Sequence, residues 1–251
     1  MKLENKVAII TGAGSGMGRT TAILFAREGA KVVVNDEHND EAKETVRMIE
    51  EEGYEGKAIP FTADVRNEEE VKAMIEKTVS HFDKIDILVN NAAVYRGHTV
   101  PETTNEEWQE LMDTNVYGPF VCCKHALPHM LKQNSGKIIN ISSFGGLVGM
   151  EGSAPYNASK GAVVNFTRGL ALECAPKGIN VNCVCPGWTE TPMVQALIDD
   201  PDMSKALLAD IPQNKFAKPE DQANLILWLA SDDSGYMNGS IVVNDGGSLI
   251  R

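Results

Sequence analysis

A tyrosine and a lysine stand four residues apart in the segment Tyr156-Asn157-Ala158-Ser159-Lys160. Residues with this spacing lie on one face of a helix, where a phenol and an ammonium group can approach each other. A free tyrosine has a pKa near ~10 and is a poor base at neutral pH. A fixed positive charge beside the ring lowers that pKa, and such a phenol can exchange a proton with a ketone or alcohol oxygen. The spacing alone occurs by chance in many helices, so it needs support from the rest of the chain.

A glycine-rich segment, TGAGSGMG, occupies residues 11–18 between an apolar run and a helical pattern. Glycine permits a tight turn and close backbone approach, and a helix N-terminus attracts negative charge. The glycine spacing departs from the common dinucleotide pattern G-x-G-x-x-G. Its place between strand and helix nevertheless favours a pyrophosphate site over a purely structural turn. The residues expected to line this site are Gly12, Ser15, Gly16, Met17 and Gly18.

An acidic residue, Asp36, follows the glycine segment at the end of the next apolar run. A carboxylate there can accept hydrogen bonds from the adenosine ribose hydroxyls and would repel a 2′-phosphate. Glu37 is also acidic and residues 11–18 contain no Lys or Arg, so the sequence predicts NAD rather than NADP. Asp64 and Val65, after the third run, are expected at the adenine, although Asp at a strand exit also caps helices.

Short apolar, β-branched runs alternate with longer segments of helical periodicity along the chain. The runs lie at residues 7–10, 31–35, 57–61, 87–90, 137–141, 180–184 and 240–243. The expected helices lie at residues 16–28, 41–52, 68–82, 106–131, 156–175 and 219–229. This alternation predicts an α/β fold in which a parallel sheet of about seven strands is covered by helices on both faces. No linker-like stretch divides the chain, so we expect one domain over residues 1–251.

The segment 188–218 is the exception to this alternation, since it is long and contains Pro192, Pro201 and Pro212. Long loops inside compact domains are usually functional or disordered. Ligands of open α/β sheets bind at the carboxyl ends of the strands, where this segment begins. We therefore expect a substrate-covering loop with short helices, the alternative being a merely mobile loop.

The whole-chain composition excludes several classes of partner. A formal net charge of −12 over 251 residues argues against nucleic acid or an anionic membrane as partner. The five cysteines show neither disulfide nor metal-ligand spacing, and no apolar stretch is long enough to span a bilayer. His125 and His129 lack a third ligand, so no metal site is expected. These features predict a cytoplasmic protein with reduced thiols.

Several motifs fall together in one order along the chain: the glycine segment, Asp64, Asn90-Asn91-Ala92, Asn115, Ser143, the Tyr156/Lys160 pair and Pro186-Gly187. In this order the chain resembles the short-chain dehydrogenase/reductase family along essentially its whole length. The resemblance implies a doubly wound Rossmann-type sheet, a nicotinamide cofactor, a small-molecule substrate and a homotetramer. It also implies transfer of hydride between the cofactor and a carbon that bears a secondary alcohol or ketone.

The resemblance also implies individual roles at the reaction centre. Tyr156 would be the acid/base, and Lys160 would lower its pKa and hold the nicotinamide ribose. Ser143, thirteen residues before the tyrosine, would stabilise charge on the substrate oxygen, with neighbouring Ser142 as the competing candidate. Asn115, inside the expected helix 106–131, would hold a water in a proton relay.

Further positions of the resemblance concern the cofactor. Asn91 and Ala92 would contact it after the fourth strand, where Ala93 replaces the family's usual Gly. If that site required positive φ, alanine would cost about 1 kcal/mol. After the sixth strand, the residues that would hold the nicotinamide carboxamide are Pro186, Gly187, Thr189 and Thr191.

The substrate is less well defined than the cofactor. Residues near the motifs are mostly apolar or aromatic: Val94, Tyr95, Phe144, Met150, Glu151, Ser153, Trp188, Met193 and Leu197. This set favours a bulky apolar or alicyclic substrate such as a hydroxysteroid. The first alternative is a 3-oxoacyl-[acyl-carrier-protein] reductase, a type that usually prefers NADP. The remote alternative is a non-catalytic NAD-sensing protein.

Overall fold

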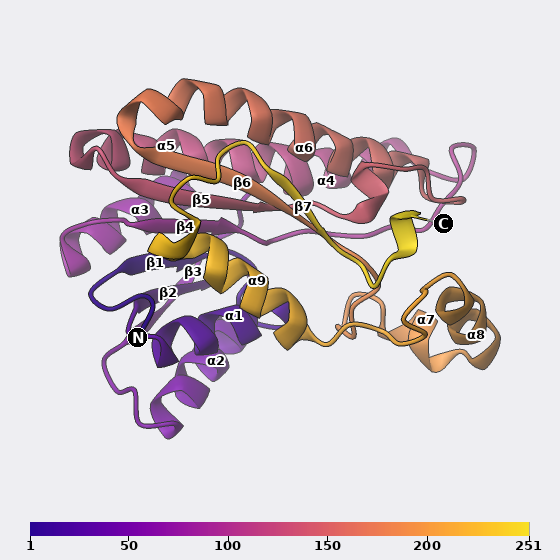
Figure 1. Cartoon of the computed structure of the whole chain (residues 1–251), viewed down its shortest axis with the longest axis horizontal. Helices are drawn as coiled ribbons and strands as arrows, with labels where there is room; N and C mark the ends of the chain where they lie inside the picture. Colours follow the sequence, from indigo (N-terminus) through magenta and orange to yellow (C-terminus); the bar gives the residue numbers. More distant parts are fainter. Residues whose placement is uncertain (251) are drawn as a thin grey trace.

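Seven parallel strands form one sheet in the order β3-β2-β1-β4-β5-β6-β7 in the computed structural model, which describes residues 1–250 (Figure 1). The order reverses between β1 and β4, so the chain winds outward from the middle of the sheet in both directions. The strands are β1 (Val7–Ile10), β2 (Lys31–Asp36), β3 (Ala58–Thr62), β4 (Ile87–Asn90), β5 (Gly136–Ile141), β6 (Ile179–Pro186) and β7 (Ile241–Asn244). This is the doubly wound sheet expected from the sequence.

Helices cover both faces of this sheet (Figure 1). One apolar cluster joins the sheet to α1, α2 and α9, and a second joins its other face to α3, α5 and α6. The main helices are α1 (Gly16–Arg27), α2 (Asn39–Glu51), α3 (Glu68–Phe82), α4 (Asn105–Met112), α5 (Gly118–Gln133), α6 (Ala154–Cys174) and α9 (Pro219–Ala230). Among residues 1–250, no helix combines the length and apolar character needed to cross a membrane.

The strands were predictable because both of their faces are covered. In β1 and β4 every residue is buried, so the sequence reads as a continuous apolar run rather than an alternation. The main-chain bounds of all seven strands lie within two residues of those expected from the sequence.

The helical stretch expected over residues 106–131 is present, but it contains an irregularity that was not predicted. A π-helical turn, Asp113–Tyr117, separates α4 from α5. The turn contains Asn115, whose side chain is buried and bonded to both backbone groups of Val94. These contacts come from a distant loop, so the hydrogen-bond pattern that widens the helix cannot be predicted from local periodicity.

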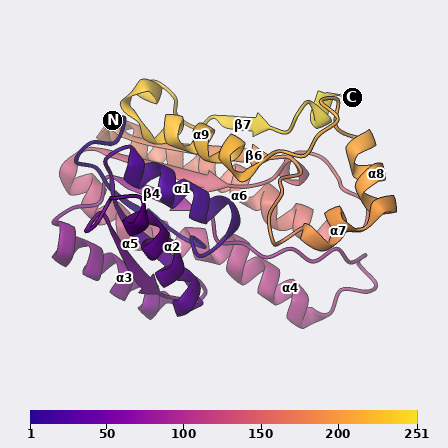
Figure 2. The same ribbon diagram turned by 90° about the horizontal axis from the view of Figure 1, so that it is seen from below.

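The segment 188–218 leaves the sheet after β6 and carries two short helices, α7 (Gln195–Asp199) and α8 (Pro201–Ala209). Figure 2 shows both helices beyond the end of the sheet. The two ends of the segment are hydrogen-bonded to each other, since Ala217 N–H donates to the Trp188 carbonyl and Glu190 N–H to the Ala217 carbonyl, each at 2.9 Å. The segment therefore leaves and rejoins the core at one place.

Candidate active site

A cavity of about 310 Å³ opens where β1, β2, β4 and β5 end. The carboxyl ends of parallel strands meet at one edge of a sheet, and the reversal of strand order separates the helices there. Many of the residues predicted to form the site line this cavity: Gly12, Ser15, Gly16, Met17, Asp36, Asp64, Val65, Asn91, Ala92, Tyr156, Lys160 and Thr191.

The cavity lining does not include the other predicted residues: Gly18, Asn115, Ser143, Pro186, Gly187 and Thr189. Conversely, the wall contains residues that sequence reasoning did not select: Asn35, His38, Ala63, Arg66, Glu110, Thr114, Ile141 and Pro192. Asn35, Ala63 and Ile141 are at or next to strand ends, a signal that could have identified them. Glu110 and Thr114 come from the α4 region, and only tertiary packing brings them to the cavity.

The glycine segment has the shape that a pyrophosphate requires. Gly16, the first residue of α1, has φ +51°, a conformation that side chains disfavour. Gly18 packs so closely that a Cβ there would lie 2.1 Å from the Gly12 carbonyl oxygen. The Ser15 side chain makes no capping hydrogen bond, so the first-turn N–H groups of α1 remain available to an anion.

Asn91, at the end of β4, fixes this segment in place. Its amide donates to the carbonyl oxygens of Thr11 at 2.9 Å and Gly12 at 3.0 Å. The backbone N–H groups of Asn91 and Ala92 both donate to the Thr11 hydroxyl. In the part of the chain that the structure describes, Ala93 is not among the non-glycine residues with positive φ, so the strain considered there is absent.

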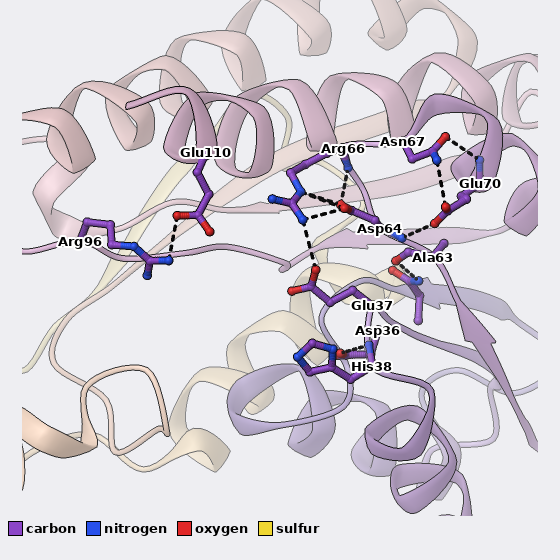
Figure 3. Close-up of polar contacts among 11 residues, drawn as sticks. Asp36, Glu37, His38, Ala63, Asp64, Arg66, Asn67, Glu70, Arg96 and Glu110 are labelled. Carbon is purple, nitrogen blue, oxygen red and sulfur yellow. Dashed lines mark hydrogen bonds and ion pairs between the residues drawn. The ribbon is translucent and has the colours of Figure 1, made fainter. Parts of the chain in front are cut away.

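Carboxylates line the end of the cavity that the sequence predicts to receive adenosine, which we call the adenosine end (Figure 3). Asp36 accepts two backbone hydrogen bonds of 3.0 Å, from Gly14 N–H to Oδ2 and from His38 N–H to Oδ1. A Cβ on Gly14 would lie 2.6 Å from the Asp36 carboxylate, so glycine is needed for this approach. The Asp36 carboxylate is thereby fixed at the cavity wall.

Arg66 connects the neighbouring acidic residues (Figure 3). Its guanidinium lies 2.7 Å from Asp64 Oδ2 and 3.4 Å from Glu37 Oε2. Burial alone would raise the pKa of Asp64, but hydrogen bonds from Arg66 outweigh it and lower that pKa. The helix cap considered for Asp64 is instead Asn67, which accepts N–H bonds from Glu69 and Glu70.

The opposite end of the cavity, where the sequence predicts the reaction and which we call the reaction end, is buried. Tyr156 and Lys160 lie on the first turns of α6 with 8% and 2% exposure, and the Lys160 ammonium is 5.8 Å from the Tyr156 ring centroid. Lys160 Nζ donates to the Ile141 carbonyl at 3.1 Å, at the end of β5. Burial lowers the pKa of Lys160 to about 8.

The pKa of the phenol differs from the sequence expectation. Burial raises the pKa of Tyr156 to about 12, and the hydrogen bond with the Ser143 side chain lowers it only in part. Desolvation of the tyrosinate is the largest of these effects, and the Ser143 hydrogen bond is the one that opposes it. The phenol is therefore fully protonated at neutral pH.

The two serines after β5 have different partners. Ser142 Oγ donates to the Lys160 carbonyl at 2.8 Å and so joins β5 to α6. Ser143 Oγ accepts the Gly145 N–H at 3.1 Å and also reaches the Tyr156 phenol. Ser143 is thus the serine that adjoins the phenol.

Asn115 uses its whole amide group in direct contacts. Its Nδ2 donates to the Val94 carbonyl at 2.9 Å and to Ser159 Oγ at 3.1 Å, while Oδ1 accepts the Val94 N–H at 2.8 Å. The residue thereby connects the loop after β4 to α6, one residue before Lys160.

The residues after β6 divide into two groups. Thr189 is buried, where its hydroxyl donates to the Gly187 carbonyl at 3.0 Å and accepts from Gln222 at 3.3 Å. A Cβ on Gly187 would lie 2.6 Å from Asp245 Cα, so this glycine permits close backbone packing. Thr191 lines the cavity opposite Gly16.

Comparisons with known proteins cover nearly the whole chain. A family model described as enoyl-(acyl carrier protein) reductase matches residues 12–248. The 3-oxoacyl-[acyl-carrier-protein] reductase of Thermotoga maritima is 40% identical over 251 residues, which is 100% of both chains.

Solved structures of oxidoreductases are also similar to this chain over nearly its whole length. Levodione reductase has a TM-score of 0.94 and 32% identity, with 99% of this chain and 100% of that chain covered. A Beutenbergia cavernae protein assigned as an NAD(P)-dependent gluconate 5-dehydrogenase, which holds NADP at low occupancy, has a TM-score of 0.94 and 34% identity. That match covers 100% of this chain and 99% of the other.

Proposed function

Since the chain belongs to the short-chain dehydrogenase/reductase family, we propose that it is an NAD(H)-dependent oxidoreductase that interconverts a secondary alcohol and a ketone. One observation carries the proposal: Tyr156 and Lys160 face one end of a cavity whose other end presents the Asp36 carboxylate. The glycine segment lies between them, with free N–H groups at the start of α1. These residues fit a dinucleotide, with its pyrophosphate at the glycines and its nicotinamide ribose at Lys160.

The residues of this chain would handle the proton and the substrate oxygen. In reduction, the Tyr156 phenol donates its proton to the carbonyl oxygen, and the Ser143 hydroxyl donates a hydrogen bond to the same atom. The bound nicotinamide supplies the hydride, or accepts it during alcohol oxidation. The phenol is protonated at neutral pH and can therefore serve as the proton donor that reduction requires.

The preference for NAD rests on charge. A 2′-phosphate on the adenosine ribose would meet Asp36 and Glu37, while the nearest guanidinium groups already have acidic partners. Arg66 is bonded to Asp64, and Arg19 lies 2.6 Å from Glu41. NADP would therefore have to separate existing ion pairs, whereas the ribose hydroxyls of NAD can donate to Asp36.

For the substrate, we propose a bulky apolar or alicyclic ketone or alcohol such as a hydroxysteroid. Four of the aromatic residues expected near the substrate or the phenol form two pairs: Tyr95 lies 4.9 Å from Tyr156, and Phe144 lies 5.9 Å from Trp188 between ring centroids. The segment 188–218 would cover the substrate as part of a single domain. The similarity to levodione reductase supports a cyclic ketone.

A 3-oxoacyl-[acyl-carrier-protein] reductase is the second candidate. The observation that favours it is the 40% identity to such an enzyme over the full length of both chains. The acidic adenosine end opposes it to the extent that this class uses NADP.

A cofactor and substrate screen tests these alternatives. NADH and NADPH are each assayed with cyclic diketones, ketosteroids and a short 3-oxoacyl thioester, with Tyr156→Phe as the control. We expect NADH and the alicyclic ketones to give the highest kcat/KM. NADPH turnover confined to the thioester would support the carrier-protein reductase instead. If NADH binds but no alcohol or ketone is converted, the protein is an NAD sensor and the proposal fails.

We also propose a homotetramer. Apolar side chains remain exposed on the α4–α5 surface, namely Trp108, Tyr117 and Phe120 at 43%, 37% and 45%. Light scattering of the purified protein tests this, and a monomer at micromolar concentration would contradict it.

A further inference from the structure

Tyr95, in the loop after β4, is the aromatic residue in contact with Tyr156. The two ring centroids are 4.9 Å apart and the ring planes are perpendicular. At the far end of the ring, the Tyr95 hydroxyl is 3.1 Å from Ser153 Oγ, at the residue before α6. Tyr95 thus contacts the start of α6 at two points, and one of them is the phenol ring proposed to react.

The backbone around Tyr95 is fixed from the opposite side. The preceding residue, Val94, is bonded through both its N–H and its carbonyl to Asn115 in the π-helical turn. Arg96 donates to the Tyr95 carbonyl at 3.0 Å and pairs with Glu110 of α4 at 2.8 Å (Figure 3 shows the Arg96–Glu110 pair). The loop is therefore attached to α4 and the π-turn, and it holds the Tyr95 ring against α6.

Ser153 provides an independent indication that the contact is specific. It is 1% exposed and occupies the position before the first residue of α6, yet its side chain caps no N–H of the helix. Its hydroxyl has the Tyr95 hydroxyl as partner. A buried hydroxyl needs a partner, and here that partner is the ring that contacts Tyr156.

We propose that Tyr95 is a positioning residue for Tyr156: its ring, fixed by Ser153 and by the loop, sets the orientation of the phenol and keeps water from it. This proposal rests on the proposed function, because orientation of the phenol matters only if the phenol transfers the proton. Perpendicular aromatic pairs are stabilising in this geometry. Loss of the Tyr95 ring would let the phenol rotate and would admit solvent beside it.

If Tyr95 keeps water from the phenol, removal of its ring should change the pKa of Tyr156, an effect that loss of a purely structural residue would not have. The groups that face the phenol are Lys160 on α6, Ser143 after β5, Cys185 on β6 and Tyr95 itself. Burial is the main cause of the high pKa of Tyr156, and the electrostatic interaction with Tyr95 raises this pKa further. Water in place of the Tyr95 ring should bring this pKa down toward its ordinary value.

Three variants test the proposal. Tyr95→Leu removes the ring, whereas Tyr95→Phe and Ser153→Ala each remove only the hydrogen bond between them. Tyr236→Leu is the matched control, because Tyr236 is fully exposed and does not line the cavity. The measurements are kcat and KM for NADH and for the best ketone, the alkaline limb of kcat, and an ultraviolet titration of the Tyr156 phenol with Tyr156→Phe as blank.

For Tyr95→Leu we expect kcat to fall about tenfold, the upper range for loss of one aromatic pair, with KM for NADH unchanged. Its alkaline limb and its phenol titration should move to lower pH. Tyr95→Phe and Ser153→Ala should match each other, with losses of about twofold and little change in the limb. The control should behave as the parent.

The proposal is overturned if Tyr95→Leu keeps the parental kcat and alkaline limb, or if it changes only KM for the ketone, which would make Tyr95 a simple wall of the substrate site. If the parent converts no ketone, the proposed function fails. The ultraviolet titration then still decides the inference, since an unmoved Tyr156 phenol in Tyr95→Leu would contradict it.

Discussion

The two ends of the cavity differ in how deeply their side chains are buried and in the contacts that hold them. At the adenosine end, Arg66 and Glu37 have side chains that are 38% and 49% exposed and are held by ion pairs. At the reaction end, Lys160 and Tyr156 are almost fully buried, and their contacts are a backbone carbonyl, a hydroxyl and aromatic rings. In the proposed function, the first end would bind the cofactor in contact with water, and the second would transfer the proton away from water.

This difference predicts which substitutions should have large effects on the enzyme and which should have small ones. Exposed ion pairs contribute at most about 1 kcal/mol each and are screened by salt. Burial shifts the pKa of a titratable group strongly, to about 12 for Tyr156 and about 8 for Lys160. Substitutions at the reaction end should therefore change turnover, and those at the adenosine end should change cofactor choice and affinity.

The largest effect is expected for Tyr156→Phe. Removal of the phenolic hydroxyl eliminates the proton donor, so kcat for ketone reduction should fall about a thousandfold. Because the adenosine end is untouched, NADH should bind as before. Steady-state kinetics and fluorescence titration with NADH measure the two effects, and loss of both together would break the proposed separation of the two ends.

Lys160→Met should follow, with kcat lower by about a hundredfold and with a change in stability against pH. Folding lowers the pKa of Lys160 from 10.5 to about 8, so between these values the unfolded chain binds more protons than the native one. The stability of the parent should therefore rise with pH across this window, and this contribution is absent below it. Urea unfolding at several pH values should show a smaller rise in the variant, and an equal rise would contradict the buried ammonium.

Asp36→Asn should have an intermediate effect confined to the cofactor. Loss of a charged acceptor for the ribose hydroxyls should raise KM for NADH about tenfold, while NADPH improves relative to NADH. The kcat with saturating cofactor should stay near that of the parent. The ratio of kcat/KM for the two cofactors is the measurement, and an unchanged ratio would remove Asp36 as the basis of the preference.

The smallest effect is expected for Glu37→Gln, which breaks the 3.4 Å pair with Arg66. The KM for NADH should change by less than about threefold, in keeping with a solvated pair. Addition of salt should abolish the difference between variant and parent. A large, salt-independent change would show that this end is less solvated than the structure indicates.

The fold could be predicted closely because its signals are local. Continuous apolar runs identify strands that are covered on both faces, and the glycine segment marks the junction of β1 and α1. The order of motifs along the chain then identified the cavity residues Gly12, Asp36 and Tyr156.

The remainder depends on contacts between residues far apart in the sequence. The π-turn contains Asn115, which is hydrogen-bonded to the distant residue Val94. Arg66 forms ion pairs with Asp64 and Glu37 because two loops approach each other. The pKa of Tyr156 depends on how completely the surrounding elements exclude water, and spacing to Lys160 carries no information on that. The sequence therefore identified the chemical groups, whereas the burial that raises the pKa of Tyr156 follows from the fold.

The backbone pairing of Trp188 and Glu190 with Ala217 has an evolutionary consequence. The chain between residues 190 and 217 therefore begins and ends at neighbouring backbone positions beside the sheet. Changes of length in α7 and α8, which bury no residue, should leave the β6–β7 pairing beside them intact. Gln213, by contrast, donates to the Gly246 carbonyl, and Thr191 lines the cavity. If this stretch covers the substrate, as we propose, exchanging it between relatives should change which molecules are accepted while Tyr156 and Lys160 stay the same.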